Sequence, residues 1–365
     1  MRYEVLACLW ILHCSCCAQE EAAASWMFRG GPQRQGCSDG LVPGARPTLV
    51  WNFQAQLYIF SSPALDAEKL YVGSHDRFLY ALDRKTGVAV WKFSAGAVVV
   101  ASPALAGGLV FFGAEDGTFF AVEARTGKEK WRLKTGGKVY SSPAVVAGTV
   151  YFGSGDKHVY ALEAANGRER WRFQTGGPVL ASPAVDGESL YIGSENNRFY
   201  ALERQTGKPR WTFKTDGAVD GSAAVCGEAV YVGCLRGTLY ALDSKSGALR
   251  WRFRPESKKR IYASPAVTGG VVYVGSEDHN LYAVDAASGK EKWRFKTGQA
   301  VCSSPVVAGA AVVFGSHDHK VYALDAASGK PLWEFETKGP VISTPAVRDG
   351  QIYFGSRDGK VYALK

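Results

Sequence analysis

The sequence is periodic, and its period restricts the folds that it can adopt. Tryptophan recurs at positions 51, 91, 131, 171, 211, 251, 293 and 333, with a step of 40 residues in every case except one of 42. A Ser-Pro-Ala position and a Tyr-Ala-Leu-Asp position recur with the same spacing. Repeats of this length are typical of solenoids and propellers, in which each unit packs against its neighbours.

Each repeat reads as four short strands separated by turn residues. In the third repeat the strands are KVYSSPAVV, TVYFGS, HVYALE and RERWRFQ, and the breaks between them are AG, GDK and AANG. Four antiparallel strands in ~40 residues make up one propeller blade. A helical solenoid is disfavoured, because no helical periodicity runs through a repeat and glycine interrupts it at short intervals.

The two ends of the repeat region predict the number of blades. The strand TLVWNFQ at 48–54 has no repeat in front of it, and the last repeat stops at Lys365 without its own Trp strand. Strand 48–54 can therefore complete the last blade and leave no open sheet edge. We predict an all-β fold in which residues 48–365 form an eight-bladed β-propeller of four-stranded antiparallel blades. Residues 25–47 form an N-terminal segment with no regular pattern.

The first residues differ from the rest of the chain. Arg2, the apolar run Val5–Leu12 and a stretch rich in small residues predict a signal peptide over 1–24, cleaved near Ala18 or Ala24. A disordered tail or a misassigned start codon is the alternative. The cysteines at 14, 16 and 17 suggest lipidation of the N-terminus, but none of them follows the residues that precede a bacterial lipoprotein cysteine. Export to the periplasm or the envelope is expected, and no apolar run reaches the ~20 residues of a membrane span.

Four cysteines lie beyond the leader, at 37, 226, 234 and 302. Cys226 and Cys234 belong to one hairpin, but around a turn at Gly227–Glu228 they face Ala229 and Gly221 and are too far apart to bond. We expect buried thiols. No Cys-x-x-Cys motif beyond the leader supports a zinc site or haem attachment.

Several segments carry a more specific signal. ALDRKTGVAVW at 81–91 and ALERQTGKPRW at 201–211 share the pattern A-x-[D/E]-x-x-T-G-x-x-x-W, and WMFRGGPQRQG precedes the repeats. Over residues 26–365 the chain resembles the PQQ-like repeat family. This family contains quinone-dependent alcohol dehydrogenases and non-catalytic propellers of the BamB type, which help to assemble outer-membrane β-barrels.

The resemblance to the dehydrogenase branch implies a set of features that this chain lacks. That branch implies PQQ with a calcium ion held by carboxylate and amide oxygens, a catalytic carboxylate, large loops and adjacent cysteines over the quinone. Here the only adjacent pair, Cys16 and Cys17, lies in the leader, and the nearly unbroken period leaves no long loops. We therefore expect no enzyme activity and no cofactor, with a PQQ-dependent dehydrogenase as the alternative.

The repeated residues have structural roles in this interpretation. The outer-strand Trp is expected to lie between neighbouring blades. The Ser or Thr of the Ser-Pro-Ala position lies on the innermost strand, where a ring of hydroxyls could bind a ligand or, as we favour, hold backbone groups near the axis.

Strand order places the blade-to-blade loops and the turns between second and third strands on one face. This face collects His75, His158, His279, His317 and His319, which suggests either a metal-binding rim or an exposed polar surface. It also carries the only insertion and the densest group of cations in the chain. This basic cluster consists of Arg252, Arg254, Lys258, Lys259 and Arg260.

The basic cluster predicts either a docking site for an acidic partner or a solvated surface. The net charge of +9 favours acidic partners in general. Nucleic acid is not expected, because the cluster has few interleaved aromatic residues and shares its face with acidic turns.

One repeat departs from the others. The stretch DGSAAVCGEAVYVGCLRG, 220–237, has Asp220 in a column without another charge, and Arg236 where the other repeats have Asp or Asn. The hairpin register brings these residues close together at one end of the axis. We predict an ion pair between Asp220 and Arg236, worth ~0–1 kcal/mol if it is partly exposed. A functional site is the alternative.

The residues therefore favour a non-catalytic, exported, monomeric propeller that acts as a protein-interaction scaffold. Assembly of envelope or outer-membrane proteins is one role that fits. The alternatives are a PQQ-dependent dehydrogenase and a propeller that captures a small ligand. The sequence does not identify a protein partner. The residues that recur in every repeat are those that the fold requires, and fold alone does not determine function.

Overall fold

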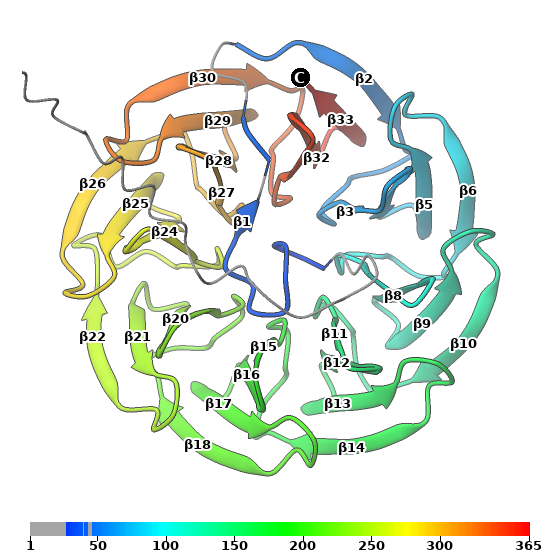
Figure 1. The fold of residues 1–365 in the computed structure, drawn as a ribbon, viewed down its shortest axis with the longest axis horizontal. Coiled ribbons are helices and arrows are strands. Elements are labelled where there is room, and N and C mark those ends of the chain that lie inside the picture. Colours follow the sequence, from blue (N-terminus) through cyan, green and yellow to red (C-terminus); the bar gives the residue numbers. More distant parts are fainter. Residues whose placement is uncertain (1–26, 39, 43–45) are drawn as a thin grey trace, which may run out of the picture.

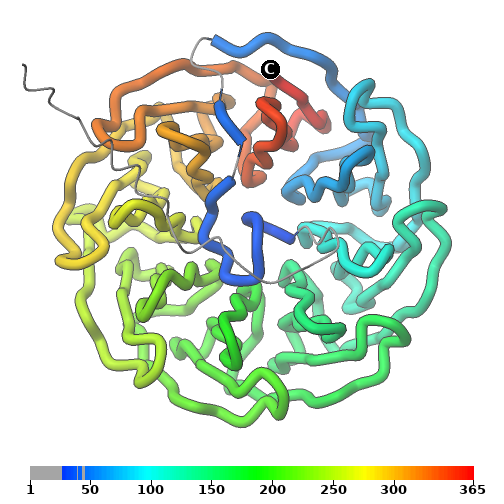
Figure 2. Tube along the Cα trace, in the orientation of Figure 1, coloured from blue at the N-terminus to red at the C-terminus, as the bar shows by residue number. Residues whose placement is uncertain are grey.

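Eight four-stranded sheets surround a common axis in the computed structural model, which describes residues 27–38, 40–42 and 46–365 (Figure 1). The predicted signal peptide at 1–24 lies outside the described residues. The predicted all-β, eight-bladed propeller is confirmed. Figure 2 follows the chain around the ring from blade 1 to blade 8.

Each blade places its first strand nearest the axis and its last strand on the rim. Blade 1 consists of β3 (Ala64–Leu65), β4 (Lys69–Gly73), β5 (Phe78–Asp83) and β6 (Ala89–Ser94), and blade 2 of β7 (Ala104–Ala106), β8 (Leu109–Gly113), β9 (Thr118–Glu123) and β10 (Glu129–Lys134). Blade 3 consists of β11 (Ala144–Val146), β12 (Thr149–Gly153), β13 (His158–Glu163) and β14 (Glu169–Gln174), and blade 4 of β15 (Ala184–Asp186), β16 (Ser189–Ser194), β17 (Arg198–Glu203) and β18 (Pro209–Lys214). Blade 5 consists of β19 (Ala224–Cys226), β20 (Ala229–Gly233), β21 (Leu239–Asp243) and β22 (Leu249–Phe253), and blade 6 of β23 (Ala266–Thr268), β24 (Val271–Gly275), β25 (Asn280–Asp285) and β26 (Glu291–Lys296). Blade 7 consists of β27 (Val306–Ala308), β28 (Ala311–Gly315), β29 (Lys320–Asp325) and β30 (Pro331–Glu336), and blade 8 of β31 (Ala346–Arg348), β32 (Gln351–Gly355), β33 (Lys360–Leu364) and β2 (Leu49–Gln54).

Blade 8 joins the two ends of the repeat region. Strand β2 pairs antiparallel with β33, from Leu49 opposite Leu364 to Gln54 opposite Lys360. Just beyond the ladder, the Thr48 N–H donates to the Lys365 carbonyl at 2.7 Å, and the Lys365 N–H donates back at 2.9 Å. Closure by strand 48–54 is thus confirmed, and blade 8 keeps no open edge at β33.

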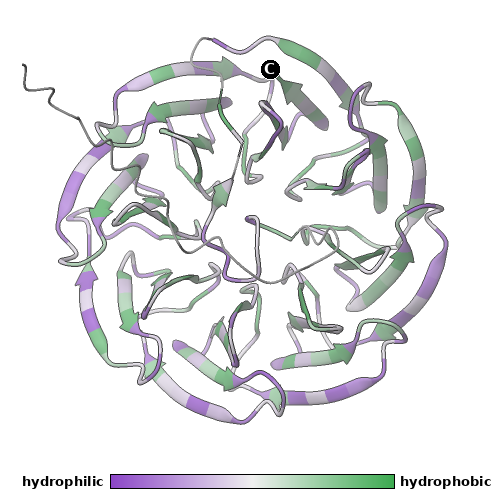
Figure 3. Ribbon diagram, viewed as in Figure 1, coloured by the Kyte–Doolittle hydropathy of each residue, from purple (hydrophilic) through white to green (hydrophobic). Residues whose placement is uncertain are grey.

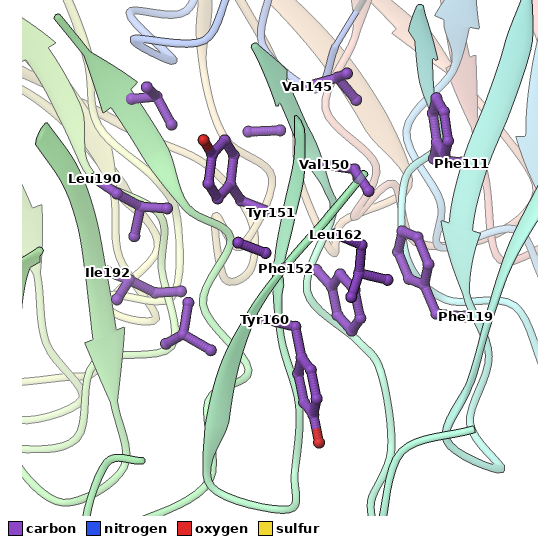
Figure 4. Close-up of a cluster of buried hydrophobic side chains, with 14 of the residues drawn as sticks. Phe111, Phe119, Val145, Val150, Tyr151, Phe152, Tyr160, Leu162, Leu190 and Ile192 are labelled. Atoms are coloured by element: carbon purple, nitrogen blue, oxygen red, sulfur yellow. The ribbon is translucent and has the colours of Figure 1, made fainter. Parts of the chain in front are cut away.

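Burial follows the position of each strand in its blade. The second strand of blade 3, β12, is buried along its whole length, whereas the outer strand β14 alternates between exposed and buried residues. Figure 3 shows the same gradient, with hydrophilic residues concentrated on the outer strands. The core therefore lies between blades, as in the cluster of Phe119, Phe152 and Tyr160 (Figure 4).

The innermost strands are shorter than the sequence suggested. The third repeat was expected to begin its first strand at residue 138, but β11 begins at Ala144, directly after Ser142 and Pro143. Pro143 has no N–H to donate to a ladder, so this part of the segment approaches the axis without strand pairing.

The Trp of each outer strand fills the seam between two blades, as predicted. Trp131 of blade 2 donates its indole N–H to the Ala164 carbonyl of blade 3 at 2.9 Å. The same bond occurs at Trp51, Trp91, Trp171, Trp211, Trp251 and Trp293, and the Trp333 side chain is buried in the last seam. Because the indole contacts both blades, one side chain joins two neighbouring sheets.

The hydroxyls of the Ser-Pro-Ala position link neighbouring blades near the axis. The Ser62 N–H donates to the Ser102 hydroxyl at 2.9 Å, and the Thr344 N–H donates to the Ser62 hydroxyl at 2.8 Å. Four further bonds of this kind start at Ser102, Ser142, Ser222 and Ser264. The expectation that these hydroxyls hold backbone groups is confirmed at these positions.

The N-terminal segment, 27–42, crosses the axis (Figure 1). Within it, Cys37–Ser38 form a short strand, β1, that pairs parallel with β27 of blade 7. Before β1, its carbonyls accept N–H groups from the inner strands of blades 4 to 7. These bonds are Val185 to Pro32 (2.8 Å), Val225 to Gln33 (3.0 Å), Val267 to Gln35 (2.8 Å) and Val307 to Gly36 (2.7 Å).

Candidate functional site

The two faces of the propeller differ. On the face that we call the mouth face, each turn between second and third strands is bonded to the loop that arrives from the preceding blade. His75 N–H donates to the Tyr58 carbonyl at 3.0 Å, for example, and Glu277 N–H to the Arg260 carbonyl at 2.9 Å. The predicted grouping of these loops is confirmed. The N-terminal segment contacts the inner strands beyond Ser-Pro-Ala and so covers the opposite end of the axis.

Aromatic and basic groups line one side of the mouth face. The Arg357 guanidinium lies 5.3 Å from the ring centroids of both Tyr58 and Phe60. His75 stacks against Phe60 with ring centroids 4.4 Å apart, and burial lowers the pKa of this histidine. The imidazole is therefore neutral at pH 7, and the charge on this side belongs to Arg357.

Asp220 lies on the other side of the mouth face. Its side chain is largely buried, and its Oδ1 atom has no hydrogen-bond partner among the described residues. Burial raises the pKa of this carboxyl group to about 6, with a further increase from the charge of Glu195 and a partial offset from Arg260. Asp220 is thus a carboxylate in an environment that disfavours its charge.

The predicted ion pair between Asp220 and Arg236 is wrong. No cation lies within 4.0 Å of the Asp220 carboxylate in the part of the chain that the structure describes, and the cation that acts on its pKa is Arg260. Arg236 instead lies over Gly217, where an added Cβ would stand 2.5 Å from the Arg236 Cγ.

The residue that compensates for Arg236 is Asp216. In blade 3 the turn acid Asp156 accepts the hydroxyl of Tyr160 at 2.7 Å. In blade 5 that turn position holds Arg236, and the hydroxyl of Tyr240 donates to Asp216 at 2.6 Å instead. The acid has moved from the turn to the neighbouring loop, because both positions reach the same tyrosine.

Asp216 is the centre of a dense polar network. It also accepts the Cys234 thiol at 2.9 Å and the Thr238 hydroxyl at 2.9 Å, and Arg254 lies 3.5 Å away. Burial alone would raise the pKa of Asp216, but the hydrogen bonds from Cys234, Tyr240 and Thr238 hold it below its usual value. Asp216 therefore stays ionised and serves a structural role.

All five residues of the basic cluster are exposed. Arg254 bonds to the Arg236 carbonyl at 3.1 Å and pairs with Asp216. The other four, Arg252, Lys258, Lys259 and Arg260, have no carboxylate within 4.0 Å of their charged nitrogens in the described parts of the chain. The cluster is therefore mostly uncompensated positive charge.

Arg252 shows how blade 5 differs from other blades. The cation after the blade Trp pairs with a glutamate three residues earlier in blades 2, 3 and 6, as Arg132 does with Glu129 at 2.7 Å. In blade 5 that glutamate is replaced by Leu249, which is 47% exposed. Blade 5 thus presents an unpaired arginine beside an exposed leucine on its rim.

The insertion that follows is held in one conformation by backbone contacts. Lys258 N–H donates to the Pro255 carbonyl at 3.1 Å, and Lys258 itself has a φ of 53°. Ile261 N–H donates to the Cys234 carbonyl at 3.3 Å, and the Ser257 hydroxyl donates to Asp278 at 2.5 Å. The lysines are therefore presented by an anchored loop.

The histidines of the mouth face do not converge on a metal site. Among the described residues, no three His, Cys, Asp or Glu side chains lie close enough together to hold a metal ion. His158 Nδ1 instead lies 3.3 Å from Asp156 within its own turn. The residues present also do not fit PQQ with calcium, because Asp220 has only Glu195 as an acidic neighbour that affects its pKa.

The cysteines at 37, 226, 234 and 302 are thiols, but the expected burial holds only for Cys234, because the other three are partly exposed. Cys234 is buried, and its bond to Asp216 together with burial raises its pKa to about 11. Burial raises the pKa of Cys302 to about 12. Neither of these two groups is a reactive thiolate at neutral pH.

Sequence reasoning missed two buried arginines in the N-terminal segment. Arg34 and Arg29 are 0% and 5% exposed, and both lie where the segment crosses the axis. The signal was present in WMFRGGPQRQG, where two arginines flank glycines and proline in a segment outside the repeats. A segment with no repeat pattern gives no register from which burial can be inferred.

Two sequence-family models match parts of this chain, in agreement with the propeller fold. A family described as "Outer membrane protein assembly factor BamB" matches residues 45–141, and one described as "Beta-alanine-activating enzyme, beta-propeller" matches residues 186–365. Both matches support a PQQ-like repeat β-propeller. Among curated protein sequences, none matches this propeller.

Solved structures with the same fold include both catalytic and non-catalytic proteins. BamB from Moraxella catarrhalis is 21% identical with a TM-score of 0.76, covering 87% of this chain and 99% of that chain. Quinohemoprotein alcohol dehydrogenase from Comamonas testosteroni is 17% identical with a TM-score of 0.81, covering 93% of this chain and 80% of that one. At these identities the likeness concerns the fold alone.

The described residues include no helix with the length and apolar character needed to cross a membrane.

Proposed function

We propose that this propeller is a non-catalytic, exported scaffold that binds an acidic protein partner on the mouth face of blade 5, in the assembly of envelope or outer-membrane proteins. The contact surface is the basic cluster, and the exposed Leu249 lies beside Arg252 on the adjoining rim. Export rests on the predicted signal peptide, and the assembly role on the likeness to BamB.

One observation carries the proposal: four exposed cations on an anchored stretch of chain have no acidic partner within the molecule. Some other exposed arginines of this propeller have one, such as Arg132 with Glu129 and Arg168 with Glu163. A fixed loop with uncompensated charge loses little conformational entropy on binding and attracts an acidic surface over a distance. Leu249 adds exposed apolar area beside Arg252.

The proposal is tested by charge reversal in the native host. Lys258→Glu, Lys259→Glu and Arg260→Glu together should abolish a cross-link formed from a photoreactive group at position 256, and higher salt should weaken the same cross-link. The matched control reverses Lys208, Lys290 and Lys330, which are exposed on turns of the opposite face. Equal loss of the cross-link in both triple variants would contradict the proposal.

A dehydrogenase is the second candidate function, and it rests on Asp220 alone, because the described residues assemble no calcium site beside it. A largely buried carboxylate with a pKa of about 6 at one end of the axis is the kind of group that a dehydrogenase uses as a base. In that case the protein mixed with PQQ and calcium reduces a dye when an alcohol is added, and Asp220→Ala abolishes the reaction. No dye reduction by the wild-type protein would remove this candidate.

A further inference from the structure

Arg29 lies at the axis with its charge enclosed by protein. The residue is 5% exposed, and burial lowers the pKa of its guanidinium to about 9, so that the group is still charged at neutral pH. The chain folds back over it, because a Cβ on Gly36 would collide with the Arg29 Nη2 atom. A residue other than glycine at position 36 would displace the guanidinium.

The donors of this guanidinium are mostly unused. Nη2 donates to the Pro265 carbonyl of blade 6, but neither Nε nor Nη1 has an acceptor among the described residues. Three N–H groups of a buried cation are therefore without a protein partner. Leaving such donors unsatisfied costs more than the net gain of an ordinary hydrogen bond.

Arg34 provides the internal comparison. It is equally buried, but its Nε, Nη1 and Nη2 atoms donate to carbonyls at Pro183 (2.5 Å), Phe28 (3.0 Å), Ser142 (2.8 Å) and Pro143 (3.1 Å). Arg34 thus uses all three nitrogens: Nε and Nη2 fasten the N-terminal segment to blades 4 and 3, and Nη1 bonds within the segment. The propeller can satisfy a buried arginine fully, and at Arg29 it does not.

A cavity of about 20 Å³ adjoins Arg29. Its polar lining includes the hydroxyls of Ser38, Ser62 and Thr344 and the thiol of Cys37, and its remaining walls come from the inner strands of blades 7 and 8. The Ser62 hydroxyl accepts the Thr344 N–H at 2.8 Å and keeps its own proton available for donation. The Ser38 hydroxyl and the Cys37 thiol already donate to the carbonyls of Val347 (2.6 Å) and Val267 (3.3 Å). The donors left for the cavity are those of Arg29 and the hydroxyls of Ser62 and Thr344, and its lining residues include no carboxylate.

The size of the cavity limits what it can hold. One water-sized species needs about 10–15 Å³, so there is room for one or two such species but not for sulfate or phosphate. A net positive charge and several hydrogen-bond donors around so small a space select a monatomic anion over water. Such an anion would neutralise the Arg29 guanidinium in place of a carboxylate side chain.

We propose that the axis of this propeller holds a small monovalent anion, chloride under physiological conditions, bound by Arg29 and the hydroxyls of Ser62 and Thr344. The ion neutralises the guanidinium and couples the N-terminal segment to blades 7 and 8. Because the anion binds the folded ring and not the unfolded chain, its binding stabilises the fold.

The wild-type protein tests the proposal directly. Crystals grown in sodium bromide should show an anomalous bromide peak within hydrogen-bonding distance of Arg29. In solution, thermal unfolding at constant ionic strength should move upward by on the order of 2 °C for each tenfold rise in chloride, with gluconate as the replacing anion. Gluconate is too large for the cavity and serves as the control for ionic strength.

Two variants locate the effect. Arg29→Met should remove the chloride dependence, whereas Arg34→Met, with the same loss of buried charge but no unmet donors, should keep it. If either variant does not fold, the bromide peak and the chloride titration of the wild-type protein are enough to test the proposal. The absence of both a bromide peak and a chloride-specific shift would show that only water fills the cavity, and a Cys37 thiolate detected by ultraviolet absorbance at neutral pH would supply the countercharge instead. Either result overturns the proposal.

Discussion

The indole of Trp51, on the strand that completes blade 8, lies directly against Gly87 in blade 1. A Cβ added to Gly87 would stand 2.5 Å from the indole Cε3 atom, and Gly87 has a φ of 72°. The same approach joins each of the next six seams, from Gly127 against Trp91 to Gly329 against Trp293. A turn glycine is thus required in each of blades 1 to 7 by the tryptophan of the preceding blade.

Gly87→Ala is expected to destabilise the ring by about 2–4 kcal/mol, because it combines a positive φ with overpacking against an indole. Gly107→Ala is the matched control, since Gly107 has a φ of 57° but nothing within 4 Å of an added Cβ. The control should cost only about 1 kcal/mol. Denaturant unfolding followed by tryptophan fluorescence measures both, and equal costs would contradict the packing argument.

The sequence predicts the fold well because each constraint is repeated. The Trp and the turn glycine recur at a constant spacing, and the unmatched strand at 48–54 can pair only with the unmatched end at Lys365. The starts of the short inner strands were harder to predict. The alternation of residue types does not show that strand pairing begins only after the Ser-Pro dipeptide.

The candidate site was predicted less well because its contacts cross between loops. The register of one hairpin brings Asp220 near Arg236, but the partner of the changed turn is Asp216, which belongs to the loop entering the blade. Single-strand register gives no distance between a loop and a turn. For Arg29 no register exists, because the N-terminal segment has no counterpart among the repeats.

Asp216→Gly is expected to destabilise the protein by about 2–4 kcal/mol, because three donors, including the Tyr240 hydroxyl, lose their acceptor. Adding Arg236→Asp recreates the arrangement of blade 3, where Gly136 and Asp156 occupy these positions. The double variant should therefore be more stable than Asp216→Gly alone by at least about 1 kcal/mol. A double-mutant cycle in urea measures the coupling, and additive effects would contradict the exchange of roles.

Asp220→Asn is expected to stabilise the protein above pH 6 and to have little effect below pH 4. The folded pKa of about 6 exceeds the ordinary value of 3.8, so the wild-type protein loses stability as pH rises between these values. The shift corresponds to about 3 kcal/mol, which partial exposure reduces to about 1–2 kcal/mol. Unfolding in urea at pH 4 and pH 8 measures the difference.

Glu256→Gln is the control for Asp220→Asn, since it removes an exposed carboxylate and should leave the pH profile unchanged. A destabilising effect of Asp220→Asn at pH 8 would mean that the ionised carboxylate has a favourable partner in solution. That result would favour a functional role for Asp220 over a purely structural one.

Ser62→Ala is expected to cost about 1–3 kcal/mol, because it leaves the buried Thr344 N–H of blade 8 without an acceptor. Ser222 supplies the matched control. It occupies the same position in blade 5 and is 3% exposed, but in the described structure its hydroxyl accepts no N–H from blade 4. Ser222→Ala should therefore cost less than Ser62→Ala in the same urea titration. Equal costs would mean that the two serines stabilise the ring through packing alone and that the bond between neighbouring blades contributes nothing measurable.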